Sequence, residues 1–396
     1  MAGKDPMERK PSGKLNIAVW IVLCAMILGL CSGCSVPFGK LVPGASHTVR
    51  EENEYTDFYY RQLDNSEKKA YRRMLSGCEK RKTRILLKPI SSESFYKAQG
   101  ALMYDHPEYF WIRSFTIRMM ADQVVQVTYP YEPSCGEQFR QVEEAAKAVL
   151  RRAPSDASDY ELLKYFYDTI IETVEYDSDA ENGQDLRSVF LTKHSVCAGY
   201  AKAFQYLCTL AGIPCITVRG TTSDNISHAW NMVKLGDQNY WVDTTWGDPV
   251  YTQETELNNI NYNYFCVPDA DLFRTHSISH NIDMDQTVIE NVFSFPECTD
   301  GSLNYYRTIG AYFETYQRGE VEQYLMENLK NGKFIGVELK FGSAEAYQSA
   351  MWDLFTGNRY FETILLNYRS FGVSSISYSY GFMEDCNYIV CNIHYR

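Results

Sequence analysis

Three residue types that together can transfer an acyl group occur in order along this chain, at Cys197, His228 and Asp243. A thiol, an imidazole and a carboxylate can serve as a nucleophile, its base and the group that orients the base. Each residue lies in a distinctive local pattern. The patterns are His194-Ser195-Val196-Cys197-Ala198-Gly199-Tyr200, His228-Ala229-Trp230-Asn231 and Tyr240-Trp241-Val242-Asp243-Thr244-Thr245-Trp246. Together they predict a Cys-His-Asp catalytic triad.

A helix is predicted directly after the cysteine, over Ala198–Ala211. Its apolar residues recur at steps of four and three, so they share one face. Gly212 is expected to end the helix, and Pro214 prevents it from resuming. A cysteine at this helix start faces unpaired N–H groups and the positive end of the helix dipole. Both favour the thiolate, and the N–H groups can hold an oxyanion.

The histidine and the aspartate are placed by a predicted hairpin. Strands are expected over His228–Leu235 and Asn239–Thr245, around the turn Gly236-Asp237. A loop of two or four residues makes His228 and Asp243 diagonal neighbours on one sheet face, roughly 5–8 Å apart at Cβ. A three-residue loop would place them on opposite faces. With the even loop, Asp243 can orient the imidazole of His228.

These motifs resemble the transglutaminase-like superfamily over about residues 160–249. The resemblance implies an α+β fold with a papain-like core. In this core the helix bearing Cys197 packs on an antiparallel sheet bearing His228 and Asp243, and small α/β regions flank it. It also implies that these residues are the nucleophile, the base and the orienter. The superfamily includes transglutaminases, peptidases, deglycosylases similar to peptide N-glycanase and inactive proteins, so it leaves the reaction outcome open.

Four residues beside the predicted triad are candidates for a substrate groove: Gly199, Tyr200, Trp230 and Trp246. Glycine lets the backbone pass close to a substrate, and aromatic rings can line an acyl groove or pack beneath the sheet. No cofactor or metal is expected. The chain beyond Cys34 has no Cys-x-x-Cys pair for structural zinc, and the acidic stretch 177–183 departs from a calcium loop in its glycine position.

The N-terminus carries basic side chains followed by an uncharged run from Leu15 to Gly33, the layout of a signal peptide. The small residues before Cys34 resemble a bacterial lipobox, which implies that Cys34 is lipidated after cleavage. Cys31 departs from the leucine that is usual in that motif. An uncleaved transmembrane anchor over residues 15–38 is therefore the alternative. Both readings predict an extracytoplasmic protein anchored to the bacterial cell membrane.

Five segments are predicted: a signal peptide over residues 1–33, a lipid-anchored tether over 34–50, an N-terminal α+β region over 51–152, the catalytic core over 153–292 and a C-terminal α/β module over 293–396. In the N-terminal region we expect a helix that is capped by Asn65 or Ser66 and runs through Cys78, helices over Ser92–Tyr104 and Glu137–Leu150, and strands over Thr83–Leu87, Phe110–Ile117 and Val124–Tyr129. In the C-terminal module we expect helices over Val321–Leu329 and Ala344–Leu354, and strands over Phe334–Phe341, Ser374–Tyr380 and Tyr388–His394.

The net charge limits the classes of partner that the protein can bind, and the cysteine content limits the number of disulfides that it can form. The formal net charge is −12, and loss of residues 1–33, with four basic and two acidic side chains, takes it to −14. This charge argues against nucleic acid, whose phosphates would be repelled. Nine cysteines lie beyond Cys34, enough for four disulfides and one free thiol in an exported protein. Cys386 and Cys391 are either a local bridge or two separate buried thiols.

The sequence predicts a cell-surface, cysteine-dependent enzyme that acts on amide bonds of a protein or peptide. Water resolving the acyl-enzyme gives a peptidase or amidase, whereas a lysine amine gives a transglutaminase cross-link. We favour hydrolysis because water is always present and no amine site is visible. The alternative from another class is a non-catalytic surface module that binds peptide or cell-wall polymer, which the intact triad disfavours. The sequence does not specify the oligomeric state.

Overall fold

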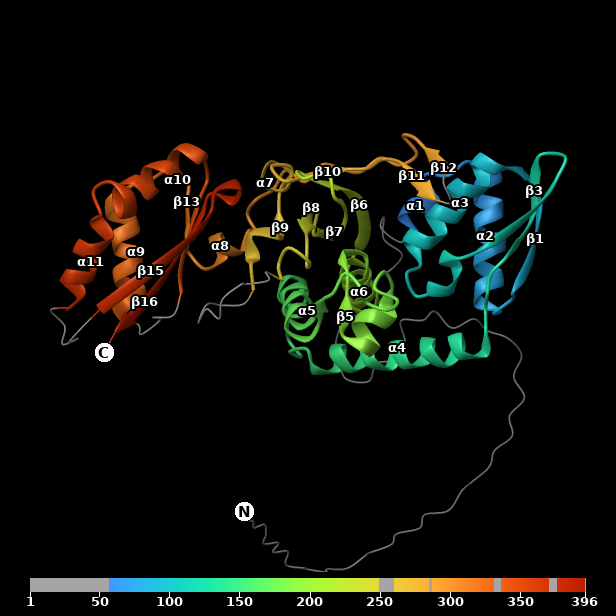
Figure 1. The fold of residues 1–396 in the computed structure, drawn as a ribbon, viewed down its shortest axis with the longest axis horizontal. Helices are drawn as coiled ribbons and strands as arrows, with labels where there is room; N and C mark the ends of the chain where they lie inside the picture. The colour runs from blue at the N-terminus through green and yellow to red at the C-terminus, as the bar shows by residue number, and fades with distance from the viewer. Residues whose placement is uncertain (1–56, 249–259, 285–286, 331–335, 370–375, 396) are drawn as a thin grey trace, which may run out of the picture. The chain divides into compact units, whose positions relative to one another are not determined.

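The computed structural model describes residues 57–395 apart from 249–259, 285–286, 331–335 and 370–375 (Figure 1). The predicted signal peptide, the tether and Cys34 lie outside the described residues. Along the described part of the chain, no helix combines the length and the apolar composition that a membrane crossing needs.

The N-terminal region contains a three-stranded antiparallel sheet of order β1-β3-β2. Its strands are β1 (Arg84–Ser91), β2 (Thr116–Met120) and β3 (Gln123–Thr128), and its helices are α1 (Phe58–Arg61), α2 (Asn65–Glu79), α3 (Ser92–Asp105) and α4 (Pro133–Arg152). Helix α2 begins one residue earlier than a cap at Asn65 or Ser66 would allow, because Asp64 is the N-cap. The Asp64 side chain accepts the backbone N–H groups of Ser66 and Glu67, and the Glu67 carboxylate accepts the backbone N–H group of Asp64.

One predicted strand of this region is wrong in its first half. Phe110–Ile117 was expected to be extended, but Phe110–Arg113 forms a short 3₁₀ turn, η2. The side chains of Phe110, Trp111 and Ile112 are all buried. Successive side chains of a strand point to opposite faces, so three buried neighbours fit a compact turn better than the outer strand of a sheet.

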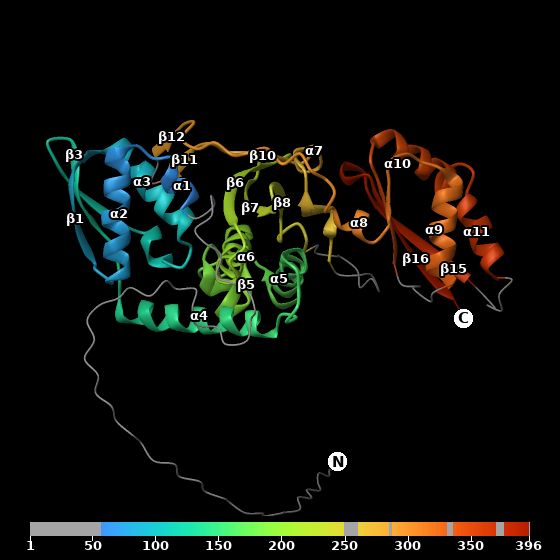
Figure 2. The same ribbon diagram turned by 180° about the vertical axis from the view of Figure 1, so that it is seen from behind.

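The core contains a five-stranded antiparallel sheet of order β10-β6-β7-β8-β9. Its strands are β6 (Cys215–Thr222), β7 (Ser227–Leu235), β8 (Gln238–Val242), β9 (Phe265–Val267) and β10 (His276–Ile278). Helices α5 (Asp159–Thr173) and α6 (Cys197–Ala211) lie side by side, and α6 packs on β6 and β7 (Figures 1 and 2). The predicted α+β class, with a cysteine-bearing helix on an antiparallel sheet, is confirmed.

Short elements complete the core and the connection that follows it. They are β4 (Glu175–Tyr176), the π-helical turn η3 (Ser188–Thr192), β5 (His194–Ser195), η4 (Tyr262–Tyr264), α7 (Asp269–Leu272), β11 (Ile282–Met284) and β12 (Thr287–Ile289). Strands β4 and β5 pair in parallel just before α6, and β11 and β12 form a hairpin.

The start and end of α6 follow from its sequence. Gly212 caps the helix with φ of 74°, a left-handed conformation that glycine adopts without a steric penalty. The buried face of the helix includes Ala201, Phe204 and Cys208. Asn231 on β7 donates its amide N–H to the Ala201 carbonyl at 2.9 Å, which fastens the helix to the sheet.

The hairpin has the even loop that the triad requires. Leu235 pairs with Gln238 across the two-residue turn Gly236-Asp237, and the ladder continues to the pair Asn231–Val242. Gly236 has φ of 59°, which suits the first position of such a turn.

The C-terminal module has a four-stranded sheet of order β13-β14-β16-β15, in which β13 and β14 are parallel. Its elements are α8 (Tyr305–Thr308), β13 (Tyr312–Phe313), α9 (Arg318–Lys330), β14 (Val337–Phe341), α10 (Ala344–Met351), the π-helical turn η5 (Trp352–Thr356), α11 (Tyr360–Arg369), β15 (Ile376–Met383), η6 (Glu384–Cys386) and β16 (Tyr388–Tyr395). It has a hydrophobic cluster of its own, which includes Val321, Leu339 and Ile389. Helix α11 was not expected from the sequence.

All nine cysteines of the described part of the chain are free thiols. Cys386 and Cys391, which the sequence left as either a bridge or two thiols, are separate and buried.

Candidate active site

The three predicted catalytic residues converge at one end of the sheet. Cys197 is the first residue of α6, His228 lies near the start of β7, and Asp243 directly follows β8. The Nε2 atom of His228 lies 2.7 Å from the Asp243 Oδ2 atom, and the Cys197 side chain is near enough to the imidazole to contribute to the raised pKa of His228. The expected order of thiol, imidazole and carboxylate is therefore present in the geometry.

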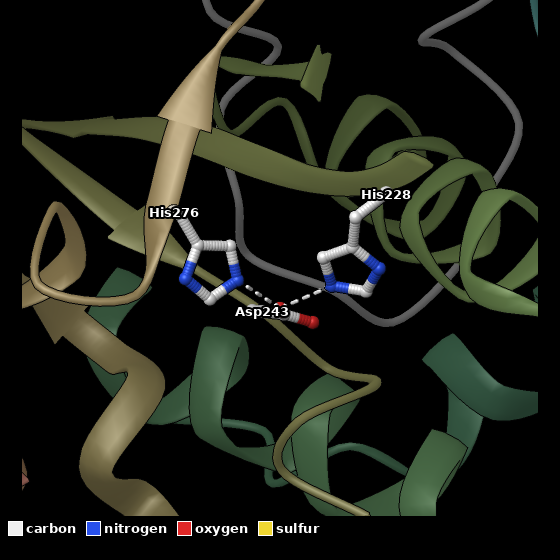
Figure 3. A group of neighbouring side chains, drawn as sticks. All are labelled: His228, Asp243 and His276. Atoms are coloured by element: carbon white, nitrogen blue, oxygen red, sulfur yellow. Dashed lines mark hydrogen bonds and ion pairs between the residues drawn. The ribbon is translucent and has the colours of Figure 1, made fainter. Parts of the chain in front are cut away.

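Asp243 is fully buried and holds four hydrogen bonds. Its Oδ1 atom accepts the backbone N–H groups of Thr245 at 2.9 Å and Trp246 at 3.1 Å. Its Oδ2 atom is shared by two imidazoles, those of His228 at 2.7 Å and His276 at 3.0 Å (Figure 3). Burial alone would raise the pKa of this carboxyl, but the charges and hydrogen bonds of the two histidines lower it well below its usual range. Asp243 is therefore a carboxylate at neutral pH.

His228 is 6% exposed, and its charge state depends on Asp243. Burial by itself would lower the pKa of the imidazole, but the Asp243 carboxylate outweighs it and raises the pKa to about 10. One ring nitrogen points to Asp243 and the other points away from it (Figure 3). An imidazolium in this place stabilises a thiolate on Cys197.

His276 is a site residue that sequence reasoning missed. It lies on β10, opposite Thr222 of β6, and its side chain is fully buried. Its Nδ1 atom lies 2.8 Å from the Thr275 hydroxyl, and its Nε2 atom is the second donor to Asp243. No local pattern around residue 276 indicates this contact, because it depends on β10 docking at the far edge of the sheet.

The atoms of His228, Asp243 and His276 that could bind a metal lie within 4.8 Å of one another. Imidazole and carboxylate are zinc ligands. Here, however, the shared oxygen already accepts two N–H groups, and the other carboxylate oxygen accepts two more. Hydrogen bonding thus satisfies every acceptor position of the carboxylate.

Two of the predicted groove residues lie inside the core. Tyr200 and Trp230 are both fully buried. The Tyr200 hydroxyl donates to the Asp248 carboxylate at 2.7 Å and contacts the Val174 carbonyl at 3.0 Å. A side chain without exposed surface cannot line an open groove, so the prediction is wrong for these two residues. Their rings pack the helix and the sheet instead.

The other two groove candidates differ from each other. Gly199 is buried, and a side chain there would overlap the Ser195 hydroxyl and the Gly183 carbonyl. It therefore serves close packing at the helix start. Trp246 is half-buried, and its ring centroid lies 6.0 Å from that of His228. A groove role for Trp246 stays a prediction.

The helix start offers donors for an oxyanion. The backbone N–H groups of Gly199 and Tyr200 bond the Val196 carbonyl at 2.9 and 3.2 Å. Those of Cys197 and Ala198 have no backbone acceptor among the described residues. Such N–H groups beside the nucleophile can stabilise the negative oxygen that forms when a thiolate attacks a carbonyl.

Two curated relatives share part of this sequence. The chain is 31% identical over 124 residues to kyphoscoliosis peptidase of Mus musculus, which covers 27% of this chain and 19% of that protein. It is 31% identical over 141 residues to kyphoscoliosis peptidase of Homo sapiens, which covers 30% and 21%. The chain thus spans about a fifth of the length of these relatives.

Solved structures that resemble part of this chain include a TGase, at 14% identity and a TM-score of 0.26 over 36% of this chain and 46% of that chain. Another is the periplasmic domain of TgpA from Pseudomonas aeruginosa bound to ethylmercury, at 19% identity and a TM-score of 0.23 over 33% and 62%. Likenesses this weak say nothing about the reaction. The model of the transglutaminase-like superfamily matches residues 146–245, which include Cys197, His228 and Asp243. The central part of this chain is therefore a transglutaminase-like domain.

Proposed function

We propose that the chain is a cysteine-dependent enzyme that acts on amide bonds of a protein or peptide, with Cys197, His228 and Asp243 as its triad. The observation that carries the proposal is the hydrogen bond that joins the His228 imidazole to the buried Asp243 carboxylate, together with the influence of Cys197 on the same imidazole. This arrangement supplies a nucleophile, a proton carrier and a fixed negative charge that keeps the carrier oriented.

The reaction begins when the Cys197 thiolate attacks the carbonyl carbon of the amide and forms a C–S bond. The resulting oxyanion accepts hydrogen bonds from the backbone N–H groups at the helix start. Collapse breaks the C–N bond, and the His228 imidazolium gives its proton to the departing amine. In the second half, His228 takes a proton from water, whose oxygen attacks the thioester. The carboxylic acid leaves and the thiolate returns.

Hydrolysis is the outcome that we propose first. The two curated relatives carry the name peptidase, which supports it. The cross-linking alternative differs only in the second half, where a lysine amine replaces water and an isopeptide bond forms. Incubation of a glutamine peptide with a fluorescent primary amine distinguishes them, because incorporation of the amine would identify a transglutaminase.

A thiol-labelling experiment tests the catalytic site itself. We expect iodoacetamide at mildly acidic pH to label Cys197 far faster than Cys135, as measured by mass spectrometry of the peptides. Cys135 is the matched control, because it is also half-buried and also lies in the first turn of a helix, α4. The preference for Cys197 should disappear in His228→Ala. Equal labelling of the two cysteines in the wild type would favour a non-catalytic module that binds peptide or cell-wall polymer.

We also propose that the enzyme works outside the cytoplasm, held to the membrane by a lipid on Cys34. The sequence supports this through the basic start, the uncharged run and the small residues before Cys34. Cys34→Ser should release the protein from the membrane fraction or leave an unprocessed precursor. Normal membrane attachment with Met1 retained would instead indicate the transmembrane anchor.

A further inference from the structure

We infer that Arg113, Lys202 and Arg219 form a site beside Cys197 for a carboxylate of the substrate, close to the scissile amide. These three residues are called the basic cluster below. The inference rests on the proposed function, since it names the substrate class of that same site: a peptide that carries a negative charge next to the bond that is cleaved.

Two members of the basic cluster, Arg113 and Lys202, contact the same residue, Gln184. Arg113 donates from Nη2 to the Gln184 side-chain oxygen at 2.8 Å, and Lys202 donates from Nζ to the Gln184 carbonyl at 3.0 Å. Gln184 follows Gly183, whose carbonyl accepts the backbone N–H of Val196 at 3.2 Å. Val196 directly precedes the nucleophile, so the two cations are fixed to the segment that positions it.

Arg219 approaches from the sheet face that packs against α6. It lies on β6 opposite Ala229 of β7, and the next pair of that ladder is Gly220 with His228. Its Nη1 atom lies 3.3 Å from the Tyr104 hydroxyl, and its side chain is exposed. Thr217, two residues earlier on the same face of β6, donates from its hydroxyl to the Gln205 side chain of α6 at 2.7 Å, so Arg219 faces the helix that begins at Cys197. The basic cluster therefore draws its side chains from the turn η2, the helix α6 and the strand β6.

The cations of the basic cluster lack acidic partners. Among the described residues, no carboxylate forms a salt bridge with Arg113, Lys202 or Arg219; their polar contacts are with Gln184 and Tyr104. Arg187 shows the contrast, because its guanidinium binds the Asp185 carboxylate at 2.8 and 3.0 Å. Asp185 is thereby committed to Arg187.

The charges within the basic cluster repel one another. Burial, followed by the charge of Arg113, lowers the pKa of Lys202 to about 7, and Arg219 acts in the same direction. Asp185 acts oppositely on Lys202, and the exposed Asp283 of β11 acts on Arg219. A bound carboxylate would relieve this repulsion. Such a concentration of positive charge is notable in a chain with a net charge of −12.

A carboxylate is the group that fits these donors. Arginine binds it through two parallel N–H groups, and lysine adds a point charge. In a peptide the carboxylate can come from the side chain of Asp or Glu, or from the free C-terminus. The chemistry of recognition is the same, so the experiment must separate the two sources.

The test compares peptides that differ in one charge. One pair carries Glu or Gln beside the scissile amide, and a second pair has a free or an amidated C-terminus. We expect kcat/KM to be about tenfold higher for the charged member of one pair, which identifies the source. Arg219→Gln and Lys202→Gln should lower kcat/KM for the charged peptide to the value for the neutral peptide measured with the same variant, so that the preference disappears. Arg118→Gln, an exposed arginine of β2, is the matched control and should keep the preference.

The result separates this inference from the proposed function. Cleavage of neutral peptides that needs Cys197 but shows no charge preference would overturn the basic cluster alone. If no peptide is cleaved, binding of the same fluorescent peptides to Cys197→Ala decides the question by their Kd. Tighter binding of a charged peptide, lost in Cys197→Ala with Arg219→Gln, would support the site even without cleavage. Equal binding of charged and neutral peptides would overturn it. Thermal unfolding confirms that each variant is folded.

Discussion

Replacement of Asp243 by Asn removes one charge and keeps the shape of the side chain. In the native protein both carboxylate oxygens accept two N–H groups each, from His228 and His276 on one side and from Thr245 and Trp246 on the other. An amide has a single oxygen. Whichever way Asn turns, its NH₂ group faces two N–H donors, so two hydrogen bonds are lost or the imidazoles must change tautomer.

The raised pKa of His228 gives a scale for the loss of acylation rate in Asp243→Asn. A rise in the His228 pKa from 6.5 to about 10 corresponds to roughly 5 kcal/mol of net stabilisation of the imidazolium, which remains after burial has opposed the contributions of Asp243 and Cys197. The comparable change in a serine-protease triad costs about four decades in rate. A thiolate–imidazolium pair that forms before the attack would depend less on proton transfer. We therefore expect Asp243→Asn to slow acylation by about one to three decades, or roughly 1.4–4 kcal/mol.

Single-turnover rates on one peptide amide, with enzyme in excess, measure this effect without the product-release step. The expected order of damage is Cys197→Ala first, then His228→Ala, then Asp243→Asn. Asp269→Asn is the matched control, because the Asp269 carboxylate accepts N–H groups of Trp241 and Cys298 at 2.7 and 3.1 Å away from the triad.

Two results would refute the reasoning. A folded Asp243→Asn variant with the wild-type rate would mean that another residue orients His228. An equal loss in Asp269→Asn would show that the rate reports general loosening of the sheet, and not the charge on Asp243.

Three further outcomes are expected. Cys197→Ala should keep the melting temperature within a few degrees while losing all covalent turnover, as seen by calorimetry and by the absence of a trapped acyl-enzyme. His276→Ala should lower the melting temperature and slow acylation by about tenfold. This loss is smaller than that of His228→Ala, because Asp243 keeps three of its hydrogen bonds. A wild-type acylation rate would show that His276 does not help to position Asp243. The pKa of His228 is raised on folding, so its contribution to stability is complete below about pH 6.5 and is lost as the pH rises to about 10. The melting temperature of the wild type should therefore fall across this pH window more steeply than that of His228→Ala. The Asp243 contribution, from a lowered pKa, should be lost only in strong acid.

The sequence allowed the closeness of His228 and Asp243 to be predicted because their geometry is local. The two-residue turn at Gly236 fixes the parity of the hairpin, and parity alone decides that His228 and Asp243 share a face. His276 could not be predicted in this way. Its contact with Asp243 requires β10 to pair with β6 more than 50 residues earlier in the chain, and no periodicity specifies such a long-range pairing.

The groove predictions failed for a related reason. Closeness to a catalytic residue in sequence does not say which way a side chain points. On β7, Trp230 lies on the same face as His228 but deeper along the strand, where its ring packs against that of Trp241. On α6, Tyr200 turns inward to Asp248. Both depend on depth within the core, which the sequence pattern did not distinguish.

The distribution of the free thiols has a consequence for how the protein responds to oxidants. Seven of the nine described cysteines are buried, and only Cys135 and Cys197 have appreciable exposed surface. Peroxide attacks accessible thiolates, so Cys197 is the first target for conversion to sulfenic acid. Mild oxidation should therefore switch off turnover while the fold persists. A thiol reductant should restore turnover as long as oxidation has stopped at the sulfenic stage.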